Sequence, residues 1–90
     1  MNGKIIVLTY SNGAIDLAKA LRVRYNNGWY AEFSEPIALN EQYFWPIYKH
    51  KGEPTSKLDV NCAYAFTGLS DVREATVKEV QFYHSQISNN

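Results

Sequence analysis

The chain has 90 residues, of which 46% are apolar and 20% charged, a composition typical of a globular protein and unlike that of a disordered one. At this length we expect residues 1–90 to form a single compact domain, which buries too little surface for a deep substrate cavity. Nine basic residues balance nine acidic ones, which excludes the strong positive charge of a nonspecific nucleic-acid binder.

The single cysteine, Cys62, excludes an internal disulfide. The apolar run that follows residues 1–4 is too short for a secretory signal or a membrane span. We therefore expect a cytoplasmic protein that does not associate with a membrane. Because Cys62 stands among alternating apolar residues, we interpret its thiol as part of the core.

The first predicted element is a strand over residues 5–10, a run of β-branched and apolar residues without alternation. Such a run is typical of a strand that is covered on both faces, so we expect it to be the central strand. Ser11 or Asn12 can then cap a helix, in whose first turn Asp16 complements the helix dipole.

A helix is predicted over residues 14–25, because the apolar residues there repeat at helical spacing. Gly28 follows two asparagines and tolerates the left-handed conformation in which helices often end. Residues 29–34 alternate apolar and polar side chains, which indicates a half-buried strand. The first 34 residues are therefore expected to form a β-α-β start with one long N-terminal helix.

The second half predicts a hairpin and a C-terminal helix. Residues 43–50 are expected to form an edge strand, because Pro46 cannot donate to a sheet ladder. A loop then leads to residues 58–66, which alternate as a strand does. Ser70 can cap a helix that extends to residue 87, although a short helix followed by a strand is an alternative, since strand formers are frequent there. The predicted fold class is α+β, with a sheet of three to five strands.

No pattern predicts a catalytic residue, a cofactor or a metal site. His50 and His84 lack the spacing of zinc ligands, and the lysines beside His50 disfavour a cation. The glutamates are scattered and stand mostly beside polar residues, as solvated surface residues do: Glu32, Glu35, Glu41, Glu53 and Glu74. We therefore expect a protein that is not an enzyme, with a small enzyme as the least favoured alternative.

Residues 43–51 stand out, because four aromatic residues precede a basic cluster. On a strand, alternate side chains point to opposite faces, so both faces of this segment are apolar or aromatic. Exposed Tyr and Trp side chains are frequent binding anchors; the alternative is that both rows lie in the core. The residues predicted to bind a partner are Tyr43, Trp45, Tyr48, Lys49, His50 and Lys51.

These features favour a small non-catalytic binding or regulatory protein that docks onto another protein, as an inhibitor or adaptor does. The alternative is a single-stranded nucleic-acid-binding module, in which the aromatic side chains of residues 43–51 stack on bases and the cations contact phosphates. A homodimer formed through the same strand is a further arrangement to consider.

Overall fold

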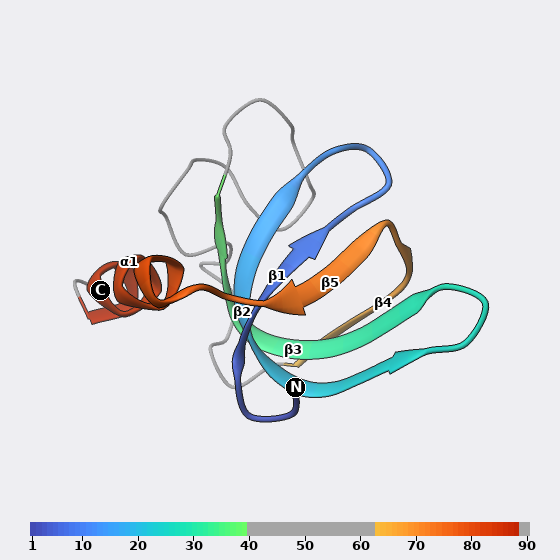
Figure 1. Cartoon of the computed structure of the whole chain (residues 1–90), viewed down its shortest axis with the longest axis horizontal. Coiled ribbons are helices and arrows are strands. Elements are labelled where there is room, and N and C mark those ends of the chain that lie inside the picture. Colours follow the sequence, from blue (N-terminus) through green and yellow to red (C-terminus); the bar gives the residue numbers. More distant parts are fainter. Residues whose placement is uncertain (40–62, 89–90) are drawn as a thin grey trace.

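A computed structural model of the chain describes residues 1–39 and 63–88. This part of the chain forms a five-stranded antiparallel sheet and one helix (Figure 1). The strand order is β4-β3-β2-β1-β5, so the fifth strand pairs with the first. The elements are β1 (Ile5–Thr9), β2 (Ile15–Tyr25), β3 (Trp29–Ala38), β4 (Tyr64–Leu69), β5 (Asp71–Glu74) and α1 (Val77–Ser88).

The sheet is curled, so that its two edges come close together. The two edge strands are β4 and β5, and only Ser70 separates them in the chain. Leu69 pairs with Trp29 of β3, while the amide of Ser70 donates a hydrogen bond to the carbonyl of Thr9 of β1 (2.8 Å). Neighbouring strands lie about 4.8 Å apart, so a flat sheet cannot bring its opposite edges this close. The curl encloses an interior cluster of Ile6, Leu8, Tyr10, Ala14, Ala18, Ala20, Ala31, Phe33, Ala38, Leu69 and Val72.

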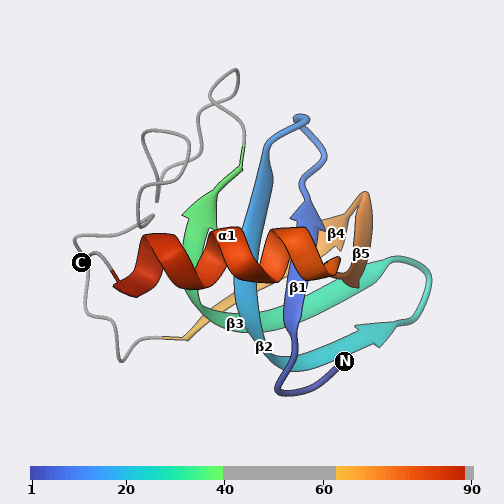
Figure 2. The same ribbon diagram turned by 60° about the vertical axis from the view of Figure 1, so that its left-hand side comes forward.

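Helix α1 lies across the other face of the sheet, over β1, β2 and β3 (Figure 2). Tyr83 anchors the helix, because its buried hydroxyl donates a hydrogen bond to the backbone carbonyl of Glu35 (2.8 Å). Burial raises the pKa of Tyr83, and the nearby Glu35 carboxylate adds to this effect. The helix and the sheet share a second apolar cluster whose buried members are Val7, Leu17, Ile37 and Tyr83.

The predicted helix over residues 14–25 is wrong, and with it the β-α-β start. Residues 15–25 form β2, the middle strand of the sheet. Leu17 faces the helix while Ala18 faces the interior, so the alternation that marks a strand is hidden by burial on both sides. Good helix formers such as Ala, Leu and Lys fill the segment, but pairing with two neighbouring strands outweighs their propensity.

The strand predicted over residues 5–10 is confirmed as β1, and its middle residues are buried on both faces. Its central place in the sheet is not confirmed, because β2 occupies that position. The strand predicted over residues 29–34 is confirmed as β3 and continues to Ala38. The predicted edge strand at 43–50 lies outside the described residues, as does the predicted strand at 58–66 up to residue 62.

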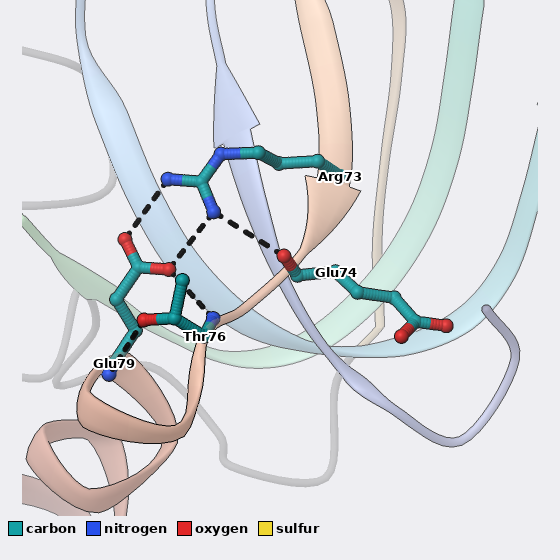
Figure 3. Close-up of polar contacts among 4 residues, drawn as sticks. All are labelled: Arg73, Glu74, Thr76 and Glu79. Atoms are coloured by element: carbon teal, nitrogen blue, oxygen red, sulfur yellow. Dashed lines mark hydrogen bonds and ion pairs between the residues drawn. The ribbon is translucent and has the colours of Figure 1, made fainter.

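The C-terminal helix is confirmed from Val77 onward, but its predicted start at Ser70 is wrong, because residues 71–74 form β5. The helix begins at a reciprocal cap, in which the hydroxyl of Thr76 accepts from the amide of Glu79 (3.2 Å) and the carboxylate of Glu79 accepts from the amide of Thr76 (2.8 Å) (Figure 3). The fold is therefore mostly β with one short helix, in place of the predicted α+β arrangement.

Candidate functional site

The residues predicted to bind a partner all lie outside the described part of the chain: Tyr43, Trp45, Tyr48, Lys49, His50 and Lys51. Cys62, Glu41 and Glu53 lie there too, so their roles stay predictions. His84 is exposed on α1, with its ring at the edge of the Tyr83 ring (5.7 Å between centroids). Across residues 1–39 and 63–88, no three His, Cys, Asp or Glu side chains come together as metal ligands do.

The hairpin formed by β2 and β3 extends beyond β1. Pairing between β1 and β2 ends where Ile5 meets Lys19, whereas β2 and β3 remain paired as far as Tyr25 and Trp29. In both views the tip of this hairpin lies away from α1 (Figures 1 and 2). We call residues 22–30 the docking hairpin.

The turn of the docking hairpin requires backbone conformations that most side chains avoid. Asn27 has a φ of +56° and Gly28 a φ of +140°, and the amide of Asn26 donates to the carbonyl of Gly28 (3.0 Å). Asparagine and glycine are the residues that tolerate positive φ. The turn is therefore specified by its residues, which fixes the register of Tyr25 opposite Trp29.

One face of the docking hairpin presents an aromatic pair. Trp29 is half-buried and packs against the interior cluster, while the side chain of Tyr25 is 65% exposed. The two rings meet edge to face, with 5.0 Å between centroids and 61° between planes. Tyr25 is thus exposed to solvent and yet held in place by a ring that the core supports, which reduces the entropy lost when it binds a partner.

The opposite face of the docking hairpin presents two guanidinium groups. The guanidinium of Arg24 lies over the Tyr30 ring, 4.6 Å from its centroid, and the Tyr30 hydroxyl donates a hydrogen bond to the Glu32 carboxylate. This hydrogen bond raises the pKa of Tyr30. Within the described residues, neither Arg22 nor Arg24 forms an ion pair with a carboxylate. Both arginine side chains are exposed to solvent.

The predicted helix over residues 14–25 hides this hairpin, because it makes Asn27 and Gly28 the end of a helix rather than a turn between strands. The signal was present, since Asn-Gly between two strand-like segments is the strongest short-range indication of a hairpin. A two-residue Asn-Gly turn would place Asn26 opposite Trp29. In the structure the loop has three residues, Asn26, Asn27 and Gly28, so Tyr25 lies opposite Trp29. Glu32 and Glu35, expected to be solvated, are half-buried, whereas Glu74 is exposed as expected.

Comparison of the chain with protein-family models, with curated proteins and with solved structures gives no match. Among the described residues, no helix is long and apolar enough to cross a membrane.

Proposed function

We propose that the protein is a non-catalytic binding protein of the inhibitor or adaptor type, and that it docks onto another protein through the docking hairpin. The observation that carries this proposal is the exposed Tyr25 ring supported by the core-packed Trp29. Tyr and Trp are enriched among the few residues that supply most of the binding energy at protein interfaces. The proposal includes a cytoplasmic location, which the single cysteine favours.

The side chains of the docking hairpin define the chemistry of the partner. Because adjacent strand residues point to opposite faces, Tyr25 and Trp29 lie on one face while Arg22 and Arg24 lie on the other. The matching partner surface is a groove with one apolar wall and one wall that carries carboxylates. Arginine suits such a wall, since its planar fork donates two parallel hydrogen bonds to a carboxylate.

A protein partner fits these charges better than a nucleic acid does. Glu32 is the cross-strand neighbour of Arg22, so its carboxylate offsets part of the positive charge of this face and leaves too little for a polyanion. The net charge of the chain is zero, whereas phosphate binding gains its affinity from many neutralised charges. We therefore treat single-stranded nucleic-acid binding as the alternative outcome of the test.

The predicted segment 43–51 remains a second contact to be tested. Its aromatic and basic residues have the same chemistry as the docking hairpin, and Trp45 provides a separate probe. A loss of binding caused by Trp45→Ala can thus be distinguished from one caused by Tyr25→Ala.

The test is capture of partners from a nuclease-treated native extract on the tagged full chain, followed by measurement of the dissociation constant for the captured protein. We expect Tyr25→Ala to weaken binding by about 30-fold, the effect of losing an interface anchor worth about 2 kcal/mol. Adding the charge reversal Arg24→Glu to Tyr25→Ala should weaken binding of the captured protein further than Tyr25→Ala alone. Val77→Ala is the matched control, because Val77 is an exposed apolar residue (75%) on α1, and it should leave binding unchanged.

Three results would overturn the assignment. Capture that succeeds from an untreated extract but fails from the nuclease-treated one would favour the nucleic-acid alternative. Binding that survives Tyr25→Ala but is lost in Trp45→Ala would move the docking surface to residues 43–51. A chain that captures only a second copy of itself would replace the partner with a homodimer.

A further inference from the structure

Asp16 is the one polar or charged residue that is completely buried in the described part of the chain. It faces the interior cluster, since its cross-strand neighbours are Leu8 of β1 and Ala38 of β3. The hydroxyl of Tyr10 donates a hydrogen bond to its Oδ2 atom (2.7 Å). Its Oδ1 atom has no hydrogen-bond partner among the described residues.

This environment disfavours the ionised form of Asp16. A buried carboxylate needs several donors to replace water, and the structure provides one. Burial therefore raises the pKa of Asp16 from 3.8 to about 8, although the hydrogen bond from Tyr10 acts in the opposite direction. Asp16 is thus mainly protonated in the folded protein at neutral pH.

The titratable groups on this interior face are few. Besides Tyr10, β4 contributes Tyr64, whose hydroxyl is buried without a hydrogen-bond partner among the described residues. The neighbours from β1, β3 and β5 are apolar, and on β5 the charged residues Asp71 and Arg73 alternate with the inward-facing Val72. No cation in this part of the chain stabilises the ionised form of Asp16.

Tyr10 connects Asp16 to the far side of the curl. Its ring meets Phe66 of β4 edge to face, with 5.2 Å between centroids, and Phe66 stacks on Phe33 of β3 (5.8 Å). Since β1 and β4 are not neighbours in the sheet, this contact crosses the interior. The hydroxyl bound to Asp16 and the ring packed on Phe66 therefore belong to one side chain that joins the two parts of the sheet.

We propose that Asp16 and Tyr10 form a proton-dependent latch that keeps the curled sheet closed while Asp16 is protonated and opens it when Asp16 ionises. Ionisation strengthens the hydrogen bond from Tyr10 to Oδ2 but leaves Oδ1 as a charged oxygen without a donor among the described residues. This oxygen favours an open form in which water reaches it, so that Tyr10 moves with Asp16 away from Phe66 and the turn between β1 and β2 loosens. The latch lies in the interior rather than on the docking hairpin, and its test is independent of any partner.

The direct test is the pH titration of the Asp16 carboxyl carbon by NMR in the full chain. We expect a midpoint near pH 8, and a midpoint near 4 would overturn the latch. With Tyr10→Phe the midpoint should rise, because the hydrogen bond that favours the carboxylate is gone.

Hydrogen exchange then tests whether ionisation opens the latch. Since the carboxyl of the opened form titrates near its ordinary pKa of 3.8 and that of the closed form near 8, protection factors for the amides of residues 10–14 and of Phe66 should fall as the pH rises between these values and level off above pH 8, while those of α1 persist. With Asp16→Asn as the matched control, which has no proton to lose, the protection of residues 10–14 should stay constant. Equal loss of protection in α1, or the same loss in the Asn variant, would contradict the latch.

Discussion

Glu35 holds the most strained backbone conformation within the described strands. Its φ is +49°, a left-handed value that costs a residue with a Cβ atom roughly 1 to 2 kcal/mol. The register between β2 and β3 shifts at this point, so the extra residue on β3 forms a bulge. The carbonyl of Glu35 accepts the hydrogen bond of Tyr83, and the strained residue thereby positions the anchor of α1.

Replacing Glu35 with glycine should relieve this strain. We expect Glu35→Gly to raise the free energy of unfolding by about 0.5 to 1 kcal/mol, the steric gain less the greater entropy of an unfolded glycine. Urea unfolding measures the change. Glu35→Gln is the control, since it removes the charge and keeps the Cβ atom; a glycine variant no more stable than this control would show that the bulge is not strained.

Two Asn-Gly pairs explain why the first half of the fold was predicted wrongly. Asn12 accepts the amide of Ala14 through its side chain (2.9 Å), and Gly13 has a φ of +93°. The same residue types stand at the tip of the docking hairpin. Helix ends and hairpin turns both use Asn and Gly, because both need positive φ or a side chain that bonds the backbone. These Asn-Gly pairs therefore indicate correctly where one element ends and the next begins, but they do not indicate whether those elements are helices or strands.

At the scale of the element, α1 was predictable and β2 was not. The start of α1 is encoded locally by Thr76 and Glu79, three residues apart. The segment forming β2 also repeats at helical spacing, and its strand conformation depends on β1 and β3, which supply neighbours on both sides. The first strand of the docking hairpin is the end of β2. A helix prediction for that segment therefore excludes the hairpin.

The contact between β5 and α1 predicts how the protein responds to acid. Arg73 donates two hydrogen bonds of 2.9 Å to the Glu79 carboxylate, which lower the pKa of Glu79 from 4.5 to about 2. A lowered pKa stabilises the folded state above pH 4.5, and this contribution is lost as the pH falls through about 2.

We therefore expect Glu79→Gln to reduce the free energy of unfolding by about 1 kcal/mol at pH 6. The difference from the unmodified protein should shrink between pH 4.5 and 2. Glu74→Gln is the matched control, because the Glu74 side chain is exposed and points away from Arg73 in Figure 3. A difference that persists unchanged at pH 2 would show that the ion pair is not its source.

At the scale of the whole molecule, the curl of the sheet places each site. Ser70 sends the chain from one edge of the sheet to the other, which encloses Asp16 in the interior and leaves the β2–β3 hairpin projecting beyond β1. Such pairings between distant segments leave little trace in local sequence patterns. The individual strands β1 and β3 could be predicted from their residues, but the interior latch and the docking hairpin depend on how those strands meet.

The most direct test of the docking hairpin is hydrogen exchange of the full chain, alone and in complex with the protein that it captures. We predict that binding slows exchange in residues 22–30 and leaves α1 unchanged. Protection confined to α1 or to residues 43–51, with the docking hairpin exchanging as it does in the free chain, would contradict the proposed docking surface.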